Sequence, residues 1–122
     1  MLAQIANIAV ALIAILHVYI LVLEMFLWTT PRGRRAFGLT AEFAEASRTL
    51  AANQGLYNGF LAAGLAWGLW QGAAGYATKL FFLGCIVVAG VFGAATANRR
   101  ILFIQAIPAA VAIALVVAGQ AA

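Results

Sequence analysis

A long apolar stretch near the N-terminus, residues 2–28, contains one histidine and one glutamate far from its ends. The stretch exceeds the roughly 20 residues that a helix needs to cross a bilayer. His17 and Glu24 lie seven residues apart, so their side chains face the same side of such a helix. A carboxylate in hydrocarbon is costly unless it is paired, protonated or hydrated. These two residues therefore predict a polar site inside a membrane helix.

The composition predicts an integral membrane protein. Of 122 residues, 66% are hydrophobic and only 8% are charged. A soluble domain of this size leaves much of its surface exposed and could not keep so many apolar side chains from water. The net charge of +4 comes from basic residues in short segments between apolar stretches, as in membrane loops. We therefore expect no nucleic-acid partner.

Four apolar segments predict an all-α fold, a bundle of four transmembrane helices. None of them alternates as the strand of a membrane barrel would. We predict a single membrane domain over 1–122, with helices at about 3–28, 40–70, 79–98 and 101–119.

The link after the first predicted span, 29–39, contains Pro31 and Gly33, which end helices, and three arginines. Thr40, followed by Glu42 and Glu45, has the pattern of a helix N-terminus. We expect this amphipathic helix to continue directly into the second span.

The distribution of basic residues predicts the orientation. Two links on one side of the membrane hold six arginines, whereas Lys79 is the sole basic residue on the other side. The positive-inside rule places the arginine side in the cytoplasm. We therefore expect a bacterial inner-membrane protein with both termini on the extracytoplasmic side. The six are Arg32, Arg34, Arg35, Arg48, Arg99 and Arg100.

Polar side chains on three predicted helices lie at depths that could form one cavity. With a rise of about 1.5 Å per residue, Glu24 lies about 6 Å inside the membrane and His17 about 10 Å deeper. We predict two connected layers along the bundle. Glu24 with Asn53, Gln54 and Gln105 forms the layer nearer the cytoplasm, and His17 with Tyr57 and Asn58 forms the deeper one.

A purely structural interpretation of the same residues stays open. Amides and histidine stabilise membrane helix pairs by hydrogen bonds, and Glu24 could pair with Arg48. Glycines spaced four apart, Gly55 with Gly59 and Gly64 with Gly68, allow helices to approach closely. They serve either packing within one chain or a homodimer.

The motifs of several chemistries are missing from the sequence. One histidine and one cysteine, Cys85, on different helices do not form a metal site, and there is no phosphate-binding glycine loop. We expect no metal and no cofactor. A buried Glu and His leave acid–base chemistry open, although we do not expect an enzyme.

Two segments carry a resemblance to a known family. HVYILVLEMFLWTTPRGRRAFGLT (17–40) and LAANQGLYNGFLAAGL (50–65) resemble the bacterial membrane proteins grouped as domain of unknown function 1304. The resemblance covers essentially the whole chain and implies four membrane helices without an assigned activity. The positions that carry it are His17, Tyr19, Glu24, Asn53, Gln54, Gly55, Tyr57 and Asn58.

Four functions are compatible with this pattern. We rank first the binding of a small amphipathic or lipid-like ligand in the polar cavity. Proton-coupled transport ranks second, since a buried carboxylate can exchange a proton for a cationic substrate. A membrane isomerase and an accessory or scaffold subunit follow. Membrane lipids are partners in every case.

Overall fold

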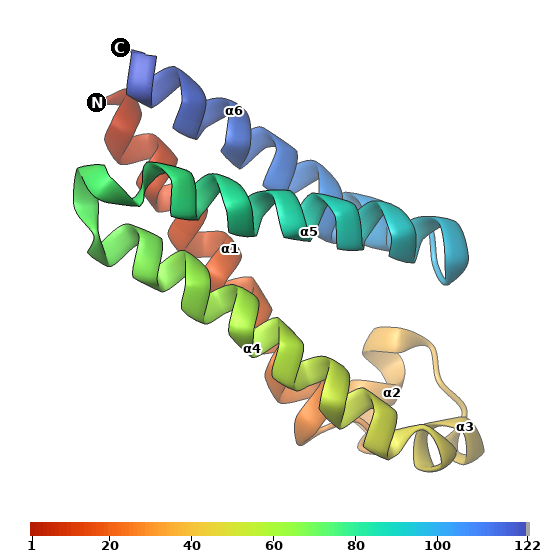
Figure 1. The fold of residues 1–122 in the computed structure, drawn as a ribbon. Coiled ribbons are helices and arrows are strands. Elements are labelled where there is room, and N and C mark those ends of the chain that lie inside the picture. The colour runs from red at the N-terminus through yellow and green to blue at the C-terminus, as the bar shows by residue number, and fades with distance from the viewer. Residues whose placement is uncertain (122) are drawn as a thin grey trace. The chain divides into compact units, whose positions relative to one another are not determined.

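The computed structural model describes residues 1–121, which are mostly helical and contain no strand (Figure 1). The all-α fold class predicted from the sequence is confirmed. In chain order the elements are α1 (Leu2–Met25), α2 (Pro31–Phe37), α3 (Ala41–Ala46), α4 (Arg48–Trp70), the 3₁₀ helix η1 (Gly72–Gly75), α5 (Tyr76–Thr96), the π-helix η2 (Leu102–Ala106) and α6 (Ile107–Ala121).

The chain divides into two compact units. The inner unit is Ile15–Ala62, and the terminal unit combines Met1–Ala14 with the chain from Ala63 onward. The inner unit contains most of the predicted site.

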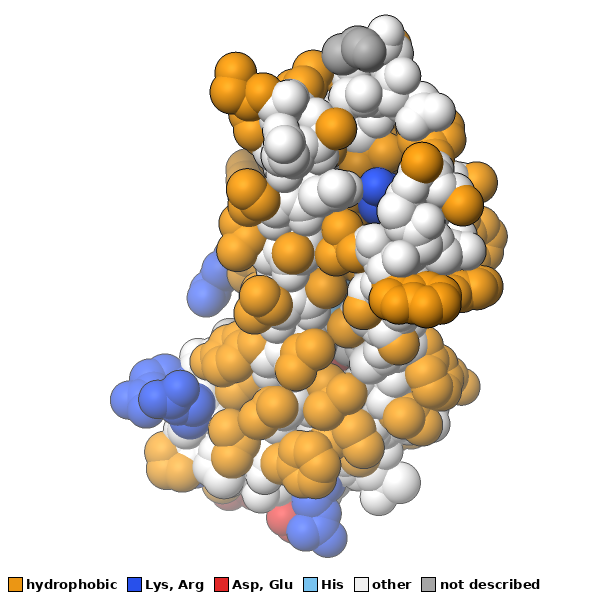
Figure 2. Space-filling model, turned by 90° about the vertical axis from the view of Figure 1, so that its left-hand side faces the viewer, with side chains coloured by type: hydrophobic (Ala, Val, Ile, Leu, Met, Phe, Trp, Pro, Cys, Tyr) orange, Lys and Arg blue, Asp and Glu red, His pale blue; other side chains and the backbone are white. Residues whose placement is uncertain are grey.

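Three helical segments are long and apolar enough to cross a membrane: Leu2–Met25, Gly72–Thr96 and Leu102–Ala121. Large hydrophobic side chains stand exposed along them, among them Leu12, Phe92 and Val111. Hydrophobic side chains also cover much of the face drawn in Figure 2. Exposed apolar surface on this scale is typical of proteins that lie in lipid.

The fourth expected span, within α4, does not meet the same criterion. At 23 residues α4 is long enough, but amide side chains in its first half lower its hydropathy. The structure therefore identifies three candidate spans rather than four. The amide residues are Asn53, Gln54 and Asn58.

In the inner unit, the second half of α1 packs against the first half of α4 at a glycine. A Cβ added to Gly55 would lie 2.7 Å from Met25 Cγ and 3.0 Å from Glu24 Cβ. A Cβ on Gly59 would likewise lie 2.7 Å from Leu21 Cδ1. Glycine at these positions lets the two helices approach closely, as small residues do in membrane helix pairs.

The link predicted over 29–39 contains a short helix, α2. Thr30 caps it, because its Oγ1 accepts a hydrogen bond from Gly33 N at 3.3 Å, and Pro31 occupies the first turn. Gly38 ends α2 with a φ of +67°, in the left-handed region, which residues with a side chain rarely adopt. Pro31 thus begins a helix of its own, whereas Gly33, which was expected to end a helix, lies inside it.

The helix expected to run without a break from residue 40 is divided at Ser47 into α3 and α4. Ser47 Oγ donates to Phe43 O at 2.6 Å, a back-bond within the helix that favours a bend. The same oxygen accepts a hydrogen bond from Trp28 Nε1 at 3.0 Å. This contact ties the bend to the chain that follows α1.

In the terminal unit, α5 lies beside η2 and α6 (Figure 1). Gly90 of α5 faces the backbone of Ala106, where an added Cβ would lie 2.7 Å from the amide nitrogen. The π-helix η2 precedes Pro108, and the Ile107 N–H bonds to Leu102 O. Because Pro108 cannot donate to Ile104 O, the wider turn provides a local adjustment to the missing bond.

We predict that Gly90→Ala destabilises the protein by about 1–3 kcal/mol, because the new methyl group meets backbone that cannot rotate away. Gly84→Ala on the same helix is the matched control, since a Cβ there meets nothing within 4 Å. This control should be neutral or stabilising by up to about 1 kcal/mol. Thermal unfolding in detergent measures both, and equal stability of the two variants would contradict the contact.

Candidate functional site

A buried hydrogen bond joins α1 to α4 in the inner unit. Asn58 Nδ2 donates to Glu24 Oε1 at 2.6 Å and also to Gln54 O at 3.2 Å. Glu24 is 7% exposed and Asn58 is 6% exposed. The bond therefore links two polar groups that are both removed from bulk solvent.

The rotation of α4 about its axis explains why Asn58 forms this bond. Gly55 faces α1 beside Glu24, and Asn58 follows Gly55 by three residues, which returns it to nearly the same face. Asn53 precedes Gly55 by two residues, about 200° around the helix, and so points away from α1. Depth alone did not identify Asn58 as the hydrogen-bond partner of Glu24, because it takes no account of rotation.

The remaining predicted residues of α4 are exposed. Asn53 and Gln54 are both exposed, and Tyr57 is 54% exposed, with its ring 5.7 Å from that of Phe60. They form an outward amide face, which we define as Asn53, Gln54 and Tyr57. Of the polar residues predicted on α4, Asn58 is thus buried, and Asn53, Gln54 and Tyr57 are exposed.

His17 and Gln105 occupy different surroundings. His17 is completely buried in the second half of α1. Gln105 belongs to the terminal unit, where it lies half-buried in η2. Asn58 bonds to Glu24, and its expected approach to His17 stays a prediction. The membership of His17 and Gln105 in a common cavity stays a prediction.

Glu24 does not pair with Arg48, which was the alternative left open by the sequence. Arg48 Nη2 lies 3.5 Å from Glu45 Oε1, and both side chains are mostly exposed. Such surface pairs contribute little to stability. The hydrogen-bond partner of the Glu24 carboxyl group is thus a neutral amide. A carboxyl group of this kind can accept hydrogen bonds or exchange a proton.

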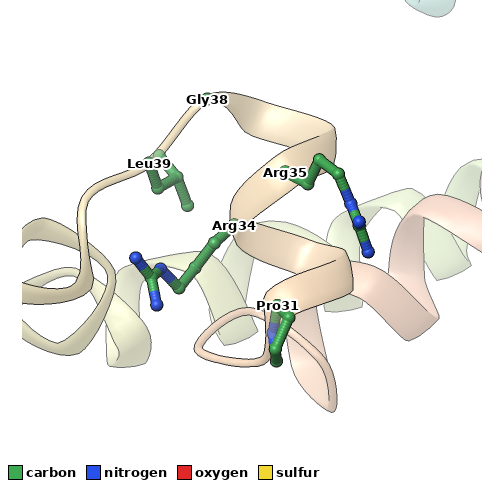
Figure 3. A pocket seen from close by; sticks show the side chains of 5 residues that line it. All are labelled: Pro31, Arg34, Arg35, Gly38 and Leu39. Atoms are coloured by element: carbon green, nitrogen blue, oxygen red, sulfur yellow. The ribbon is translucent and has the colours of Figure 1, made fainter.

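Sequence reasoning missed the arginines of α2 as residues of a cavity. Arg34 and Arg35 line it together with Pro31, Gly38 and Leu39 (Figure 3). The signal was present in the sequence, since Thr-Pro at the start and Gly at the end are typical of a short capped helix. Pro31 and Gly33 had been interpreted only as helix breakers, and Gly38 had not been considered.

Comparison with known proteins places the chain in a family. Residues 11–117 match the model of the family described as "Protein of unknown function (DUF1304)". The chain belongs to this family. The match confirms the resemblance found in the sequence, and it includes both residues of the Glu24–Asn58 bond.

One relative of this DUF1304 chain is the "Uncharacterized protein YpaA" of Lactococcus lactis subsp. lactis (strain IL1403). The two are 31% identical over 96 residues, which cover 77% of this chain and 81% of the relative. No solved structure matches the chain. Neither description names an activity.

We predict that Asn58→Ala destabilises the protein by about 1–3 kcal/mol, because it leaves the buried Glu24 carboxyl group without its donor. Asn53→Ala is the matched control on the same helix and should change stability by less than about 0.5 kcal/mol, since its side chain is exposed. Thermal or denaturant unfolding in detergent measures both.

A double-mutant cycle isolates the pair itself. Glu24→Ala combined with Asn58→Ala should cost less than the sum of the single changes, with a coupling of about 0.5–3 kcal/mol. Additive effects would show that the hydrogen bond does not couple α1 to α4.

Proposed function

We propose that this protein binds a small amphipathic, lipid-like molecule on the amide face of α4, within a bacterial inner membrane. The observation that supports this is the buried Glu24–Asn58 bond, which holds α4 in a rotation that turns Asn53, Gln54 and Tyr57 outward. In hydrocarbon such groups need hydrogen-bonding partners. A ligand with a polar group supplies them.

The surroundings of the amide face favour an amphipathic ligand over a polar one. Leu50 is 75% exposed and Phe60 is 53% exposed, and both lie on the same side of α4 as Asn53 and Tyr57. The ligand's polar group bonds to the amides and the hydroxyl group, while its apolar part lies along Leu50 and Phe60. Glu24 and Asn58 act as positioning residues behind this surface.

We predict that a ligand co-purifies with the protein in mild detergent and is lost in the variant Asn53→Ala/Gln54→Ala. The bound ligand is measured by native mass spectrometry of the intact protein. It is then extracted and identified. Gln120→Ala removes an exposed amide from α6 and is the control that should keep the ligand.

Two results would contradict this function. The same ligand bound to wild type and to the double variant would exclude the amide face. A dimer that dissociates in Asn53→Ala/Gln54→Ala, with no small molecule bound, would assign the face to contact with a second copy of the chain.

A second candidate, proton-coupled transport, is favoured by the neutral partner of Glu24. A buried carboxyl group without a bonded cation can take up and release a proton as a cationic substrate passes. In liposomes with a pH gradient, uptake of a lipophilic cation should be abolished by Glu24→Gln and retained in Glu45→Gln, which changes an exposed carboxylate. Equal uptake by both variants would rule out a role for Glu24.

The proposed topology has four spans, with α4 as the additional one. About 1.5 Å per residue over its 23 residues gives α4 enough length to cross. The arginine-rich α2 would then face the cytoplasm and both termini the outer side.

Cysteine labelling tests this topology. In a background with Cys85→Ser, we predict that Ala36→Cys reacts with a membrane-impermeant maleimide only after the membrane is opened. Ala73→Cys should react in intact cells. Both positions are exposed. The opposite pattern would invert the topology, and labelling of both from outside would remove α4 as a span.

A further inference from the structure

A surface cavity of about 400 Å³, largely open to its surroundings, lies at α2 and shares no residue with the amide face. Its lining combines two cations with apolar groups, from Pro31, Arg34, Arg35, Gly38 and Leu39. In Figure 3 Arg34 and Leu39 lie on one side of α2, and Arg35 extends from the other side. A molecule in this position would meet guanidinium groups and an aliphatic side chain together.

The backbone that carries these arginines is held firmly at the end of α1. Gly33 is packed so closely against the Leu27 carbonyl group that there is no room for a Cβ. The rings of Trp28 and Phe37 lie 4.9 Å apart, and Trp28 is also bonded to Ser47. The arginines therefore project from a fixed short helix rather than from a flexible link.

The charges of the two cavity arginines are not neutralised by acidic residues. Over residues 1–121 the ion pair found is the one between Arg48 and Glu45, which leaves Arg34 and Arg35 without a carboxylate partner. Arg34 Nε is buried and has no hydrogen-bond partner among the described residues. An unsatisfied donor on a charged group is costly, and an anionic oxygen is the acceptor that suits guanidinium groups best.

The position of α2 indicates where such an anion comes from. The candidate membrane span α1 ends at Met25, and α2 begins a few residues later, at Pro31. Phe26 is 68% exposed and Leu50 is 75% exposed in the same unit, so apolar surface for lipid tails lies close in sequence to the basic helix. Basic residues directly beside a membrane span are attracted to anionic headgroups.

We propose that the cavity at α2 binds the phosphate group of an anionic phospholipid. The guanidinium group of Arg34 donates to a phosphate oxygen, and Arg35 adds charge from the other side of the helix. Pro31 and Leu39 contact the glycerol and the first carbons of the chains. These apolar contacts favour a lipid phosphodiester over free phosphate.

The test uses the full-length protein in detergent, titrated with phosphatidylglycerol or phosphatidylcholine in mixed micelles and measured by native mass spectrometry. Wild type should prefer phosphatidylglycerol. Arg34→Gln/Arg35→Gln should reduce this preference about 25-fold, from roughly fivefold for each arginine near a membrane surface. The matched control is Arg99→Gln/Arg100→Gln, which removes the same charge from two exposed arginines.

Several outcomes would overturn the proposal. An equal loss in both double variants would indicate net charge rather than a site, and no loss in either would exclude the arginines of α2. Displacement of phosphatidylglycerol by equimolar inorganic phosphate would assign the cavity to a free anion. Should the double variant fail to fold, Arg35→Glu alters only an exposed side chain and should by itself lower the preference.

The result is distinguishable from that of the proposed function. Asn53→Ala/Gln54→Ala should leave the phosphatidylglycerol preference unchanged, while Arg34→Gln/Arg35→Gln should leave the ligand of the amide face bound. Loss of both the phosphatidylglycerol preference and the ligand of the amide face in either double variant would contradict the separation of the two sites.

Discussion

The close approach of α1 and α4 at Gly55 makes the rest of the inner unit possible. With any side chain at this position, the helices would have to separate, because the added Cβ would lie 2.7 Å from Met25 Cγ. At the observed distance Asn58 reaches Glu24 and donates at 2.6 Å. Hydrogen bonds between membrane helices stabilise by only about 0.6–2 kcal/mol, so close packing has to supply the remaining stability.

That bond also determines which part of α4 is exposed. Once Asn58 faces α1, Asn53 and Tyr57 are carried to the opposite side of the helix, next to Leu50 and Phe60. A polar stripe beside apolar groups distinguishes α4 from the three apolar candidate spans. Burial of one amide and exposure of the others follow from a single helix rotation, and the proposed ligand surface depends on it.

The corner formed by α2 and α3 depends on different interactions. Thr30 and Gly38 define the ends of α2, while Trp28 contacts both Phe37 and Ser47. These contacts place Arg34 and Arg35 at the end of a candidate span, where they form no ion pair with an acid among residues 1–121. The inner unit thus presents two chemically distinct surfaces, one of neutral amides and one of cations.

Much of the fold follows from the sequence alone, because helix formation and lipid exposure depend on local composition. The apolar stretches predicted the helices, and His17, Glu24 and Asn58 were recognised as polar residues in costly positions, where the structure buries all three. Pairing could not be predicted in the same way. It depends on the rotation and register of two helices, which Gly55 decides through contacts with residues about thirty positions earlier in the chain. For the same reason, only the tertiary structure could show that Asn58 bonds to Glu24, that Asn53 and Gln54 face outward, and that Arg34 lines a cavity.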